Sequence, residues 1–142
     1  MKATEARFLE FLKKSPTEYT LAVHGHLAEN SPMRPLFDVF RKEVLALDPC
    51  VSEEILKLYV AYKAETNFVD VIPQKSRLCL SLNIPFHDLH DPKGIAKDVK
   101  NRGRWGNGDT EVGLNKPEDL PYVIGLVRQA IERQMGDLEG EP

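Results

Sequence analysis

The sequence predicts an α+β fold, in which helices pack against an antiparallel sheet of three or four strands within a single domain. Two observations carry this prediction. Apolar residues recur at helical spacing toward both ends of the chain, and short β-type runs follow one another in the middle. The links between the central runs have four residues or fewer, too short for parallel crossovers. In chain order we expect α, α, β, β, β, α, β, α.

Apolar spacing and capping residues define the helices. Residues 3–14 form a short amphipathic helix that ends before Pro16, and residues 17–30 read as a loop or short strand. Ser31-Pro32 opens a second helix that ends near Asp48, and Asp91-Pro92 opens a short one that reaches about Lys100. Pro117 opens the last helix. The core stripes of the second and last helices are Leu36, Phe40, Val44 and Leu47, and Leu120, Ile124, Val127 and Ile131.

The strands follow from β-branched and aromatic runs bounded by turn residues. We expect a three-stranded meander and a later fourth strand, at 57–63, 68–72, 77–82 and 109–114. Leu78, Leu80 and Leu82 alternate with smaller or polar residues, which predicts one buried face and one outward face for the third strand.

Composition excludes whole classes of protein. The chain has 142 residues, of which 42% are hydrophobic and 29% charged, so a disordered or fibrous protein is excluded. No apolar run approaches the roughly 20 residues that span a bilayer, and residues 1–16 lack the apolar stretch of a signal peptide. We expect a cytoplasmic protein without membrane contact. Cys50 and Cys79 form no Cys-x-x-Cys pair, so we expect reduced, partly buried thiols.

Positive charge gathers in one stretch of this otherwise acidic chain. The net charge is −3, yet residues 93–104 sum to +4. Such a stretch is typical of phosphate or nucleic-acid contact, although a solvated helix face gives the same count. The glycines that follow do not form a Walker or dinucleotide-binding loop. Trp105 can stack on a base or close the core over the sheet edge. Our binding hypothesis comprises Lys75, Lys97, Lys100, Arg102, Arg104 and Trp105.

Two metal hypotheses are weaker. His24-x-His26 and His87-x-x-His90 each place two imidazoles on one face of a regular element, but no cysteine lies near either pair in the sequence. A metal-dependent nuclease needs an acidic residue and then an acid-x-Lys pair that converge. Asp98-Val-Lys100 matches the second half of that motif literally, and Asp70 is one candidate for the first acidic residue. We expect no catalytic residues, no metal and no cofactor.

Four phrases resemble a bacterial and archaeal domain family of unknown function, some of whose members are labelled predicted transport proteins. They are Tyr59-Val-Ala-Tyr-Lys63, Asn67-Phe-Val-Asp-Val-Ile-Pro-Gln-Lys75, Asp91-Pro-Lys-Gly-Ile-Ala-Lys-Asp98 and Gly106-Asn-Gly-Asp109. The resemblance covers residues 17–135 and implies a domain that commonly lies at the C-terminus of larger proteins, behind nuclease-like domains. It makes Asp98, Gly106, Gly108 and Asp109 a structural signature and supplies no catalytic residue.

Residues 1–16 resemble instead the opening of GmrSD-type restriction proteins, whose N-terminal domain is ParB-like. The Tyr-Gln-Arg and Asp-Gly-Gln-Gln-Arg phrases of those proteins are missing. The resemblance therefore implies such a protein with its catalytic middle removed: an N-terminal remnant at 1–16, the α+β domain at 17–135 and a disordered acidic tail at 136–142. The leading hypothesis is a non-catalytic accessory or recognition module from a restriction context. The alternatives are a metal-dependent phosphodiesterase and a protein-interaction domain or homodimer.

Overall fold

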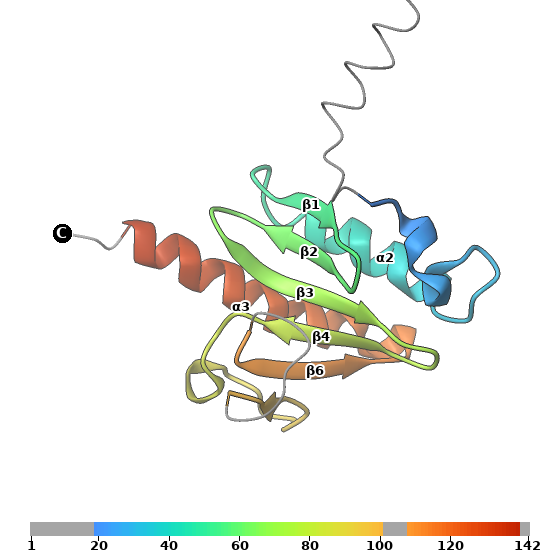
Figure 1. Ribbon diagram of the computed structural model, residues 1–142. Helices are drawn as coiled ribbons and strands as arrows, with labels where there is room; N and C mark the ends of the chain where they lie inside the picture. The colour runs from blue at the N-terminus through green and yellow to red at the C-terminus, as the bar shows by residue number, and fades with distance from the viewer. Residues whose placement is uncertain (1–18, 101–107, 140–142) are drawn as a thin grey trace, which may run out of the picture.

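A computed structural model of the protein describes residues 19–100 and 108–139, and the side chains of those residues up to 136. Six antiparallel strands form one open sheet in the order β1-β2-β3-β4-β6-β5. Two α-helices, α2 (Arg34–Leu45) and α3 (Leu120–Glu139), lie on the same face of this sheet (Figure 1). The α+β class and the antiparallel pairing are thus confirmed, whereas the expected number of three or four strands is wrong.

The strands are β1 (Ser52–Ile55), β2 (Val60–Lys63), β3 (Asn67–Pro73), β4 (Leu78–Leu82), β5 (Lys97–Asp98) and β6 (Thr110–Leu114). Short 3-10 turns complete the described chain at Leu21–Val23, Gly25–Leu27, Phe86–Asp88 and Pro117–Asp119. No described helix combines the length and the apolar character needed to cross a membrane.

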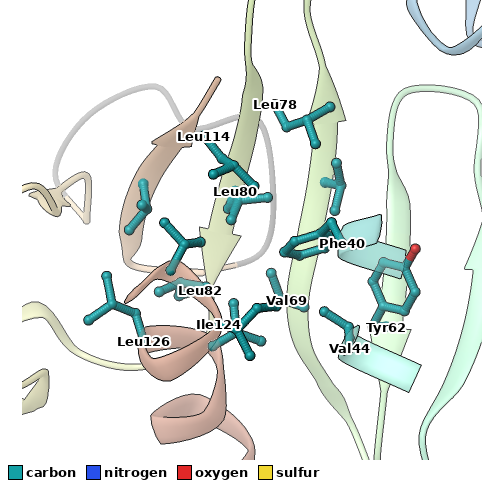
Figure 2. Packing of buried hydrophobic residues seen from close by; sticks show 14 of the residues in the cluster. Phe40, Val44, Tyr62, Val69, Leu78, Leu80, Leu82, Leu114, Ile124 and Leu126 are labelled. Atoms are coloured by element: carbon teal, nitrogen blue, oxygen red, sulfur yellow. The ribbon is translucent and has the colours of Figure 1, made fainter. Parts of the chain in front are cut away.

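The core lies between the sheet and the two helices. Figure 2 shows leucines of β4 and β6 directed toward α3, and Tyr62 of β2 beside Phe40 of α2. The rings of Phe40 and Tyr62 meet edge to face, with centroids 6.1 Å apart, a favoured arrangement for aromatic pairs. All four stripe residues of the last helix and three of the four in the second are buried, which is what their helical spacing predicts.

The two additional strands are the ones with the weakest β-type sequences. β1 contains two glutamates, but Glu53 accepts two hydrogen bonds from Arg41 at 2.8 and 2.7 Å and one from the Tyr62 hydroxyl at 2.8 Å. These contacts join β1 to α2 and β2. A turn closed by Leu56 N and Tyr59 O, 2.9 Å apart, separates β1 from β2, so the single strand predicted at 57–63 begins at Val60.

The face of the sheet turned away from α2 and α3 is called the outer face below. On β4 it carries Cys79 and Ser81, which are 1% and 5% exposed. On β3 it carries Asp70, also 1% exposed. The expectation of an outward, solvated face for the strand at Leu78–Leu82 is therefore wrong. Gly108 covers Ser81 in part, because its N–H donates to the Ser81 hydroxyl at 2.9 Å.

Candidate nucleic-acid interface

The segment from Asp91 to Lys100 is an ordered loop that ends in the edge strand β5. The helix predicted there does not form. The Asp91 carboxylate accepts from Ala96 N at 2.8 Å, and Gly94 N donates to Asp91 O at 3.0 Å. Gly94 has φ of 66°, a left-handed conformation that interrupts a helix and that glycine adopts without steric cost.

Two side chains of α3 fasten this loop. The Tyr122 hydroxyl donates to the Asp91 carboxylate and accepts from Lys93 N at 3.0 Å. Gln129 makes a pair of hydrogen bonds to the backbone of His90, both 2.8 Å long. Partial burial raises the pKa of Asp91, but hydrogen bonds from Tyr122 and from nearby backbone amides outweigh it and hold that pKa below its usual value. Asp91 is thus a charged anchor of the loop.

The fastened loop presents three exposed lysines at one edge of the sheet. The Lys93 ammonium lies 4.7 Å from the centre of the Tyr122 ring, a cation–π distance. Lys97 lies on β5 and Lys100 follows the strand, and neither forms an ion pair with another described residue. Asp98 lies between them, and its carboxylate accepts from Lys100 N at 3.1 Å. Within the described part of the chain, no carboxylate forms an ion pair with Lys97 or Lys100 that would compete with an external anion.

Gly108 and Asp109 lead from the glycine-rich run into β6. A Cβ on Gly108 would lie 2.1 Å from the carbonyl oxygen of Leu82, so only glycine fits this approach of two backbones. Asp109 O accepts from Val99 N at 2.9 Å and extends the pairing of β5 with β6. Arg102, Arg104, Trp105 and Gly106 lie outside the described residues.

Lys75 does not join the lysines of the β5 edge. It lies in the turn between β3 and β4, next to the Leu78–Leu114 end of the sheet, whereas Lys100 lies near the Gly108 end. Six residues of strand separate these ends, which is about 20 Å at roughly 3.3 Å per residue. Lys97 and Lys100 lie three residues apart at the β5 edge, and Lys75 lies at a distance from both.

Sequence reasoning missed a cation on the outer face of the sheet. Arg77 precedes β4, and one of its terminal nitrogens lies 3.6 Å from a Glu111 oxygen on β6. Glu111 is paired with Lys97 of β5, so Arg77 lies between Lys75 and Lys97. The available signal was Gly113, because a glycine within a strand often marks a place where another group approaches closely.

The metal hypotheses find no support in the described residues. Among them no three His, Cys, Asp or Glu side chains gather as a metal site would require. His24 is buried and its Nε2 lies 2.8 Å from Leu56 O, while His26 is exposed. Burial lowers the pKa of His24 despite that hydrogen bond. His24 therefore acts as a structural contact.

The phosphodiesterase alternative requires Asp70 and Asp98 to converge, and the sheet separates them. Asp70 is in register with Ser81, Glu111 and Lys97, one residue away from Asp98. Alternation along a strand therefore places the two aspartates on opposite faces. Three strand spacings also lie between them, about 14 Å at roughly 4.8 Å each. These residues cannot share one metal ion.

The two cysteines differ in exposure: Cys50 is exposed and Cys79 is buried. Burial, with a smaller influence from the Glu111 carboxylate, raises the pKa of Cys79 to about 11. A thiol with that pKa is not a thiolate nucleophile at neutral pH.

Comparison with known proteins gives the chain a family. A family model described as a domain of unknown function, DUF5655, matches residues 23–134. The chain therefore belongs to the DUF5655 family. It is similar to an uncharacterized protein of Haemophilus influenzae, with 38% identity over 108 residues, 75% of this chain and 36% of that protein. The chain thus matches little more than a third of that relative's length. No solved structure matches it. Neither finding mentions a restriction protein or nuclease-like neighbours, so that context stays a prediction.

Proposed function

We propose that this domain is a non-catalytic accessory module that binds nucleic acid through the edge of its sheet at β5. The carrying observation is the pair Lys97 and Lys100, which are exposed and form no ion pair with another described residue. Lysines without carboxylate partners can neutralise phosphates and release counterions, which is the main source of sequence-independent affinity for nucleic acid. Lys93 adds a third positive charge to the same loop.

The local charge supports the same interpretation at the level of the sequence. Arg102 and Arg104 follow Lys100 closely in the chain, and residues 93–104 sum to +4 in a protein whose net charge is −3. An acidic protein that interacts with nucleic acid needs such a concentrated basic stretch. The loop is also held in place by Tyr122 and Gln129, and a preorganised loop loses less entropy on binding.

An accessory role fits the length of the Haemophilus influenzae relative, in which the matched region is 36% of the protein. The remaining part of that relative leaves room for another activity. A restriction context, as the first sixteen residues suggest, is the setting that we propose for this chain as well.

Fluorescence anisotropy titrations at several salt concentrations test the proposal. The probes are a labelled single strand and a duplex of the same sequence. Removing two phosphate contacts in Lys97→Ala/Lys100→Ala should weaken binding to both and reduce the slope of log K against log salt by about 2. Lys42→Ala/Lys57→Ala is the matched control, because it removes the same charge from two exposed lysines on α2 and in the β1–β2 turn. Equal losses in both double variants, or no binding by the wild type at low salt, would contradict the proposal.

A further inference from the structure

Arg77 lies flat against the outer face of the sheet. A Cβ built on Gly113 of β6 would be 2.8 Å from Nη1 of Arg77 and 3.5 Å from its Cδ. The guanidinium therefore occupies the space that a side chain at Gly113 would fill. Gly113 pairs with Cys79 of β4 and is itself exposed, so this position lies at the surface of the sheet.

The guanidinium is held from two directions and keeps most of its donors. Its Nε donates to the Gln74 side chain at 2.7 Å. Its Nη2 lies 3.6 Å from Glu111 Oε2, too far for a strong hydrogen bond. The side chain of Arg77 is 37% exposed. An arginine has five N–H donors in a rigid fork that matches the oxygens of a phosphate, and one of these donors is used among the described residues.

We infer that Arg77 is a phosphate-contacting residue that extends the β5 edge across the outer face of the sheet. This inference rests on the proposed function and adds a residue to the same interface. Lys75 lies two positions before Arg77, and Lys97 lies opposite Glu111, which Arg77 approaches. Arg77 thus places a positive charge on the outer face of β6, between the turn that contains Lys75 and the edge strand that contains Lys97.

A structural role alone explains less of this arrangement. A partly exposed ion pair with its atoms 3.6 Å apart contributes little to stability, and Gly113 weakens a strand interior by its backbone entropy. A binding role accounts for both features, because the absent side chain at Gly113 lets the guanidinium lie against β6 and approach Glu111, the residue paired with Lys97.

Four single variants test the inference in the same anisotropy titrations, with a single strand and a duplex as probes. Arg77→Ala should weaken binding of both probes about tenfold at low salt and reduce the salt slope by about 1. Arg77→Lys should keep most of the slope but only part of the affinity, because lysine lacks the fork. Gly113→Ala keeps every charge and displaces the guanidinium, so it should also weaken binding. Thermal melting of each variant verifies that it is folded.

Arg133→Ala is the matched control. Arg133 lies on α3, its side chain is 40% exposed, and it pairs with Asp88 at 3.5 Å, so it resembles Arg77 in charge, exposure and ion pairing but not in position. Its loss should leave affinity within about twofold of wild type, because α3 lies on the face of the sheet opposite to the one that Arg77 covers (Figure 1). Equal effects of Arg77→Ala and Arg133→Ala, an unchanged affinity in Gly113→Ala, or an effect confined to one probe would each overturn the inference. If Lys97→Ala/Lys100→Ala alone loses affinity, the proposed function stands without Arg77. If the wild type does not bind, both fail.

Discussion

Replacing Gly108 by alanine should be one of the most damaging small substitutions in this protein. The new Cβ would lie 2.1 Å from the carbonyl oxygen of Leu82, 2.4 Å from its carbon and 2.9 Å from Asn83 N. The shortest of these distances is about 0.9 Å below the 3.0 Å that Cβ atoms keep from other groups. All three atoms belong to the backbone at the end of β4, so no side chain can rotate away.

The magnitude follows from two losses. Forcing extra volume into packed surroundings costs typically 1–3 kcal/mol and occasionally more. Moving Gly108 away from Leu82 also breaks its hydrogen bond to Ser81, and a typical hydrogen bond contributes about 1 kcal/mol. We therefore expect a loss of about 3 to 4 kcal/mol from a total of roughly 5–15 kcal/mol for a small domain. Urea unfolding followed by far-UV circular dichroism should show a midpoint lowered by about 2 M.

Two other glycines provide the controls for the same chemical change. Gly125 lies on the exposed side of α3, where an added Cβ would have nothing within 4 Å, so Gly125→Ala should stabilise the protein by roughly 1 kcal/mol through helix propensity. Gly113→Ala displaces only the flexible end of Arg77 and should stay within about 1 kcal/mol of wild type. A Gly108→Ala protein as stable as wild type, or any other ranking of the three variants, would refute this reasoning.

Four further outcomes are expected. Tyr122→Phe removes a donor to Asp91, so an NMR titration should find the pKa of Asp91 moved upward. Since that pKa is lowered in the fold, the charged carboxylate stabilises the fold above the unfolded-state pKa of about 3.9. This contribution is lost as the pH falls through the folded-state pKa. In Asp91→Asn, the free energy of unfolding should therefore fall less steeply as the pH is lowered through this range. A thiol reagent should modify Cys50 in the native protein and Cys79 only after unfolding, and two reactive native thiols would contradict the burial. Glu111→Gln removes a negative charge beside Lys97 and should tighten nucleic-acid binding at low salt; weaker binding would mean instead that Glu111 is needed to hold the neighbouring cations.

The sequence predicts best those elements that depend on the spacing of apolar residues close together in the chain. The stripe from Leu120 to Ile131 recurs at helical intervals, and α3 buries all four of its members. β3 and β4 also form where their apolar runs predict them. Each of these patterns is read within a window of a dozen residues, so no knowledge of distant partners is needed.

The elements that sequence reasoning missed depend on partners far along the chain. β1 owes its place to Arg41, twelve residues from Glu53. The loop at Asp91 is fastened by Tyr122, thirty-one residues away. An aspartate before a proline predicts locally the start of a helix. Here the distant Tyr122 hydroxyl binds the Asp91 carboxylate and Gly94 is left-handed, so the segment forms a loop instead.

The candidate site was also predicted only in part, for the same reason. The surplus of positive charge in residues 93–104 is visible in the sequence, but which cations share a surface is decided by strand register. The strand order places Arg77, which reaches Glu111 on β6, one strand away from Lys97 of β5, although Arg77 and Glu111 are thirty-four residues apart. The same register separates Asp70 from Asp98, which match a nuclease motif in the sequence but do not converge in the structure. A site assembled across a sheet is therefore better predicted from outward positions in neighbouring strands than from the charge of any one segment.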